Sequence, residues 1–85
     1  MKYSFVYTRR AVKDIQQLEG KIKKRIGDTL RRYSEDPLKY ANKLTDPRLG
    51  SYRFRIGDYR VIFDLEGHKI VVLRVGHRRD IYRKL

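Results

Sequence analysis

The stretch SYRFRIGDYRVIF, residues 51–63, determines the fold because it reads as two alternating β-strands joined by a tight turn. Apolar side chains at positions 52, 54 and 56 alternate with Arg53 and Arg55, and apolar side chains return at 59, 61 and 63. Gly57-Asp58 is a two-residue hairpin signal. A two-residue turn there places Arg55 directly opposite Arg60, on the sheet face opposite to the one that carries the apolar residues.

A third strand is predicted from residue 69 to 75, after a turn at residues 66–68. A three-residue turn pairs Phe63 with Val71 and keeps an unbroken apolar face, so we favour it over a two-residue turn at residues 66–67. This register puts Arg74 opposite Arg60. The predicted sheet then carries a row of arginines on one face: Arg53, Arg55, Arg60, Arg74 and Arg78.

Upstream of the hairpin, residues 3–7 are predicted to form a strand and residues 9–36 a helical hairpin. Thr8 is a plausible N-cap, Gly20 marks the corner, and the helix ends at Asp36-Pro37. Residues 37–50 are predicted to form a loop. The fold class is therefore α+β: an N-terminal strand, a helical hairpin and a three-stranded antiparallel meander, with one small sheet packed on the helices.

Composition limits the functional classes. The chain has 85 residues, so we expect one domain over 1–85. It holds 22 Lys and Arg against 10 Asp and Glu, a net charge of +12 that favours polyanionic partners such as nucleic acid. It has no cysteine, which excludes disulfides and thiol catalysis, and two histidines are too few for a His-rich metal site. There is no membrane-length apolar run and no secretory leader pattern, and we expect a cytoplasmic protein.

The arginine row admits two interpretations. Like charges opposite one another in a sheet destabilise it by about 0.2–1 kcal/mol a pair, so folding alone does not favour the row, whereas a bound phosphate would. The alternative is a solvated face whose arginines pair with carboxylates such as Asp64. For the basic residues of the helical hairpin we expect long-range attraction only; these are Lys21, Lys23, Lys24, Arg25, Arg31 and Arg32.

Two segments together resemble a known family: SYRFRIGDYRVIF at 51–63 and VLRVGHRRDIY at 72–82. They are similar to the RelE/ParE toxin superfamily and, more narrowly, to RelE-type toxins, as are YTRRA at 7–11 and ANKL at 41–44. The resemblance implies a RelE-like fold and a ribosome-dependent endoribonuclease that cuts mRNA in the A site. The substrate's own 2′-hydroxyl attacks the adjacent phosphate, with no metal or other cofactor. It also implies a cognate RelB-like, acidic antitoxin as the partner.

The resemblance also implies roles for individual residues. Arg60 matches the arginine that stabilises the phosphate, and Arg78 matches one that contacts the scissile phosphate and assists the leaving oxygen. Tyr82 matches a tyrosine that stacks on a base and acts as general base. Arg53 and Arg55 stand where well-studied members carry lysines. A guanidinium titrates too high to serve as a base, so we assign these two to electrostatic stabilisation.

Three further residues are candidates for RNA contact: Arg74, His77 and Lys43. His77 has two interpretations. It could take part in catalysis, because a histidine can act as acid or base near neutral pH. Strand parity instead places it on the apolar face, as a packed or hydrogen-bonded residue at the sheet edge.

Two other functions remain open from the sequence. One is a ParE-like toxin that poisons DNA gyrase and has no nuclease activity; it would not need the arginine row or Tyr82. The other is a basic RNA-binding protein without catalysis, which would bind RNA in a salt-sensitive way and release no cleaved product.

Overall fold

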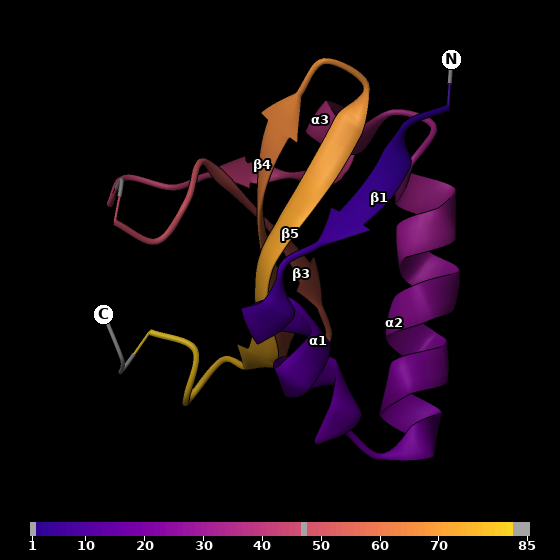
Figure 1. Ribbon diagram of the computed structural model, residues 1–85, viewed down its shortest axis with the longest axis vertical. Helices are drawn as coiled ribbons and strands as arrows, with labels where there is room; N and C mark the ends of the chain where they lie inside the picture. Colours follow the sequence, from indigo (N-terminus) through magenta and orange to yellow (C-terminus); the bar gives the residue numbers. More distant parts are fainter. Residues whose placement is uncertain (1, 47, 83–85) are drawn as a thin grey trace.

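The computed structural model describes residues 2–46 and 48–82, which form one five-stranded sheet with helices on one face. The elements are β1 (Ser4–Tyr7), α1 (Arg9–Gln16), α2 (Gly20–Tyr33), α3 (Pro37–Tyr40), β2 (Asn42–Lys43), β3 (Tyr52–Ile56), β4 (Tyr59–Glu66) and β5 (Lys69–His77). The strand order is β1-β5-β4-β3-β2; β1 is parallel to β5 and the other pairs are antiparallel. Figure 1 shows α2 on one side of this sheet, and the loop before β3 and the C-terminal segment on the other.

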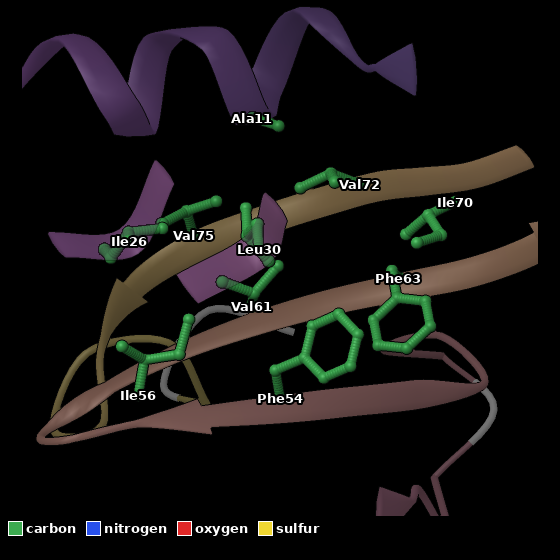
Figure 2. Close-up of a cluster of buried hydrophobic side chains, with 10 residues drawn as sticks. All are labelled: Ala11, Ile26, Leu30, Phe54, Ile56, Val61, Phe63, Ile70, Val72 and Val75. Atoms are coloured by element: carbon green, nitrogen blue, oxygen red, sulfur yellow. The ribbon is translucent and has the colours of Figure 1, made fainter. Parts of the chain in front are cut away.

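The helical hairpin forms where the sequence predicts it. The Thr8 hydroxyl accepts a hydrogen bond from the Ala11 amide (3.1 Å) and so caps α1, and α2 starts at Gly20. The core lies between these helices and β3, β4 and β5 (Figure 2). Its buried members are Ala11, Ile26, Leu30, Phe54, Ile56, Val61, Phe63, Ile70, Val72 and Val75. Among the described residues, no helix is long and apolar enough to cross a membrane.

The segment predicted as a loop contains two short elements. Pro37 opens α3 at a position where its missing N–H is no loss, and the Tyr33 and Tyr40 rings stack at 4.1 Å. β2 then pairs with the start of β3, with Asn42 opposite Arg53. The prediction of a loop over 37–50 was therefore wrong at residues 37–40 and 42–43, because α3 and a two-residue strand are too short to give a periodic pattern.

The predicted register of β5 was also wrong. The turn is the two-residue Gly67-His68, with Gly67 at φ +60°, and Phe63 pairs with Val72. A β-bulge follows, so that Ile62 pairs with Arg74 and Arg60 pairs with Gly76. The bulge adds one residue to β5, which keeps apolar side chains on the helix side both before and after it. Arg74 is therefore not opposite Arg60.

The sheet face that points away from α2, called the outer face below, is not fully solvated. Ile62 in β4 and Ile81 after β5 are both buried there. The loop before β3 presses on this face: a Cβ on Gly50, at φ +149°, would lie 2.8 Å from Leu73 Cδ1 and 2.9 Å from Ile62 Cγ2. Ile81 approaches Gly76, where a Cβ would lie 3.6 Å from Ile81 Cδ1. These contacts hold two irregular segments against the strands that carry the arginines.

Candidate functional site

The hairpin between β3 and β4 brings two arginines together. Arg55 and Arg60 pair across the ladder, as predicted, which separates their Cα atoms by about 4.5–5.5 Å. The Arg60 guanidinium folds back along the turn, and its Nη1 donates to the carbonyl oxygens of Gly57 and Tyr59, both at 2.9 Å. Neither arginine has a carboxylate partner within ion-pair distance in the described part of the chain. Their two positive charges are therefore left for an external anion.

Arg78 joins this turn from the end of β5. Its backbone N–H donates to the Asp58 carbonyl oxygen at 2.8 Å, which fixes the chain beside the turn. Its side-chain Nε lies 3.7 Å from Asp58 Oδ1, and both side chains are more than half exposed. An ion pair this long and this exposed is weak, so a phosphate can displace Asp58 from Arg78.

A further arginine reaches the same turn from α2. Gly57 has φ +60°, and a Cβ there would lie 2.8 Å from both terminal nitrogens of Arg25. Sequence reasoning placed Arg25 among solvated helical charges, because only the packing of α2 against the hairpin reveals this contact. Four guanidinium groups thus surround or border the turn; the arginine cluster is Arg25, Arg55, Arg60 and Arg78.

Tyr82 lies next along the outer face, bound to Arg53. Arg53 Nη1 donates to the Tyr82 hydroxyl oxygen at 2.8 Å, which links the C-terminal segment to β3. The Tyr82 oxygen acts as acceptor in this bond, so its own O–H stays free to donate. Arg53 Nε is buried and has no hydrogen-bond partner among the described residues. Leaving such a donor unpaired costs about 1–3 kcal/mol, which points to a role for Arg53 other than stability.

The structure separates Arg74 from the other arginines. Its Nε donates to Asp14 Oδ2 of α1 at 2.8 Å, in an ion pair that is largely removed from water. The same Asp14 oxygen accepts the Val75 amide at 3.0 Å, at the edge of β5 that β1 does not reach. Arg74 thus ties α1 to the sheet, and its charge is matched inside the molecule.

The other two RNA-contact candidates lie on different sides of the sheet. His77 pairs with Tyr59 on the helix side, where the two rings meet edge to face at 5.4 Å. Lys43 is exposed on β2 and lines an open cleft on the outer face, together with Arg48 and Asp64. Arg48 is not free there, because it binds Asp46 at 2.9 Å and lowers the pKa of that carboxyl.

The arrangement suits a trigonal or tetrahedral oxyanion. Guanidinium groups offer several donors in fixed planes, and clustering them favours a species whose negative charge increases during reaction. A phenol O–H nearby supplies a group that can exchange a proton or stack on a base. A small basic α+β domain with arginines and a tyrosine on one sheet face can therefore bind a phosphate-bearing anion and act on it.

Comparison with known proteins identifies the family. The family model described as the ParE toxin of the type II toxin–antitoxin system parDE matches residues 5–82, so the chain belongs to this toxin family. The toxin RelG of Mycobacterium tuberculosis is 33% identical over 91 residues, covering 99% of this chain and 100% of RelG. Toxin RelE3 of Methanocaldococcus jannaschii is 30% identical over 86 residues, covering 91% of this chain and 92% of the relative.

Solved structures agree with this family. The toxin–antitoxin complex RelBE2 from M. tuberculosis contains a chain with a TM-score of 0.82 and 26% identity, which matches 92% of this chain and 100% of that one. A double arginine-to-alanine mutant of the E. coli toxin RelE, solved in the free state, has a TM-score of 0.78 at 24% identity over 96% of this chain and 92% of that one, and supports the fold alone. The chain is a RelE-like toxin of a type II toxin–antitoxin system.

Proposed function

We propose that this toxin is a ribosome-dependent endoribonuclease that cuts mRNA in the ribosomal A site. The 2′-oxygen of one nucleotide forms a bond to the adjacent phosphorus while the bond from phosphorus to the 5′-oxygen breaks. The proton leaves the 2′-hydroxyl, and the leaving 5′-oxygen gains one. The products are a 2′,3′-cyclic phosphate and a 5′-hydroxyl end, so no water is consumed.

The arginines oppose the charge that develops on the phosphorane-like transition state. Arg55 and Arg60 face the non-bridging oxygens from neighbouring strands, and Arg78 assists the leaving 5′-oxygen. Tyr82 stacks on a base or takes part in the proton transfer through its free O–H. Arg53 orients Tyr82 through the 2.8 Å hydrogen bond and adds positive charge beside it. These roles require positioning and electrostatics rather than a strong base.

One observation carries the proposal: Arg55 and Arg60 stand opposite each other, with no carboxylate partner among residues 2–46 and 48–82, at a turn that Arg78 also contacts. Such a placement opposes folding through charge repulsion. It is therefore explained by an anion that binds there, and RNA is the anion that this family resemblance indicates.

The same proposal includes a cognate, acidic, RelB-like antitoxin. Similar chains have been solved as RelB–RelE complexes from M. jannaschii and Pyrococcus horikoshii, at TM-scores of 0.73 and identities of 28% and 26%. The net charge of +12 favours an acidic partner. Covering the outer face, or enlarging the toxin beyond what the A site admits, would silence it.

In-vitro translation with purified toxin tests the proposal. Primer extension on the message should show cleavage within A-site codons only while ribosomes translate, and the 5′ ends produced should accept phosphate from a polynucleotide kinase. A DNA-supercoiling assay run in parallel tests the gyrase alternative that a ParE family description raises. Inhibited supercoiling with intact mRNA would overturn the nuclease proposal in favour of gyrase poisoning.

A further inference from the structure

The position of Tyr82 depends on a tight turn that follows β5. The His77 carbonyl oxygen accepts the amides of Asp80 (2.9 Å) and Ile81 (3.0 Å), which reverses the chain onto the outer face. Ile81 is 1% exposed and anchors the segment there. The next residue is Tyr82, whose hydroxyl meets Arg53. A change in this turn therefore moves Tyr82 relative to the arginines.

The His77 side chain also makes a hydrogen bond within this turn. Its Nδ1 accepts the backbone N–H of Arg79 at 3.1 Å, two residues ahead. Asn and Asp side chains make this bond in Asx-turns, so His77 acts here as their imidazole counterpart. An accepting Nδ1 carries no proton, which requires the neutral ring with its hydrogen on Nε2.

The ring is held in that orientation by its neighbours. Tyr59, the partner of His77 in the β4–β5 ladder, packs edge to face against the imidazole. His77 lines a cleft of about 470 Å³ between α1 and the end of β5, and none of the four arginines of the cluster lines it. The His77 imidazole therefore lies on the sheet face opposite to the one that carries Arg55 and Arg60.

We propose that His77 is a positioning residue, whose Nδ1 holds the turn that delivers Tyr82 to Arg53 and so completes the site. This inference rests on the proposed nuclease function for its activity readout. It assigns His77 neither a proton transfer nor an RNA contact. What matters is the acceptor atom at the Nδ1 position, and the aromatic ring is secondary.

Two substitutions separate the acceptor from the ring. In His77→Asn the side-chain oxygen stands near the Nδ1 position and can accept the Arg79 N–H, but the contact with Tyr59 is lost. In His77→Phe the ring contact remains and the acceptor is lost. We expect H77N to keep kcat for cleavage of ribosome-bound mRNA close to wild type. We expect H77F to lower kcat by about 2- to 13-fold, the factor that corresponds to the net free energy of one hydrogen bond, with KM unchanged.

The activity results decide between explanations. Cleavage by H77F at the wild-type rate would overturn the proposal, and so would equal impairment of H77N and H77F, which would assign the effect to the ring. Arg79→Ala is the matched control, because it keeps the backbone N–H that His77 binds.

Nuclear magnetic resonance tests the same geometry without any activity. Long-range ¹H–¹⁵N spectra of the wild-type toxin should show His77 Nδ1 unprotonated and Nε2 protonated. The Arg79 amide and the Tyr82 ring should shift in H77F and stay near their wild-type positions in H77N. A protonated Nδ1, or an unmoved Tyr82 in H77F, would overturn the positioning role. If these shifts appear while no variant and no wild-type toxin cuts mRNA, the nuclease function fails and the role of His77 in placing Tyr82 stands.

Discussion

The Arg60→Ala variant separates the chemistry of the arginine cluster from the stability of the fold. Removing the guanidinium deletes the two hydrogen bonds that Nη1 donates to the carbonyl oxygens of Gly57 and Tyr59. Water replaces part of them at this exposed turn, so the net loss is about 0.5–1.5 kcal/mol. It also relieves the repulsion with Arg55 across the ladder, worth about 0.2–1 kcal/mol. The free energy of unfolding should therefore change by between about −1.3 and +0.5 kcal/mol, which is small for a folded domain.

The effect on catalysis should be much larger. Deleting one preorganised donor to a developing oxyanion lowers kcat by about 10²- to 10³-fold, which corresponds to about 2.7–4.1 kcal/mol of transition-state stabilisation. Urea denaturation followed by circular dichroism measures stability, and single-turnover cleavage of ribosome-bound mRNA measures the rate. Arg9→Ala is the matched control, because Arg9 is an exposed arginine at the start of α1.

Two results would refute this reasoning. If Arg60→Ala cuts at the rate of the Arg9→Ala control, Arg60 does not stabilise the transition state. If its unfolding free energy falls by more than about 3 kcal/mol, the lost activity reports a damaged fold, and Arg60 is structural.

The remaining predictions concern stability. Asp14→Ala should lower the unfolding free energy by about 2–4 kcal/mol in urea melts, because the Val75 amide and the Arg74 guanidinium both lose the carboxylate that they bind. Unchanged stability would contradict a structural role for Asp14. Gly50→Ala should cost about 2–4 kcal/mol, because a clash of about 1–3 kcal/mol adds to backbone strain of about 1 kcal/mol. Gly67→Ala, which has open space around it, should cost the strain alone, about 1 kcal/mol; equal losses in the two variants would show that the clash does not destabilise the protein. Partial burial raises the pKa of Tyr7, so the folded state keeps the phenol proton to higher pH and loses stability as pH rises above about 10. Tyr7→Phe should flatten that loss in thermal melts between about pH 9 and 11.5, and parallel curves would argue against it.

Local patterns in the sequence predicted the elements that depend on near neighbours. The Thr8 cap, the helical hairpin and the pairing of Arg55 with Arg60 all follow from short-range rules. The register of β5 did not, because a bulge at residue 73 leaves no mark in an apolar run where either parity is hydrophobic. With that register the expected place of Arg74 beside Arg60 was also lost.

For the candidate site, the alternation of side chains along the strands predicted which residues share a face, and nothing further. Parity placed Arg53, Arg55 and Arg60 on one face, and the structure agrees. The contact of Arg25 with the Gly57 turn and the burial of Ile62 and Ile81 depend on how α2 and the C-terminal segment pack from a distance. Their roles in RNA cleavage stay predictions until the variants are measured.

The pairing of β1 with β5 has a consequence for how the toxin is made. The Thr8 hydroxyl bonds to the Leu73 carbonyl, 65 residues later, and β1 takes its place in the sheet beside β5 alone. At about 5–20 residues per second, the first strand waits roughly 3–13 s during synthesis before its neighbour exists. Long-range pairing of this kind also slows folding after release. A nascent copy therefore lacks a complete sheet until β5 has been synthesised.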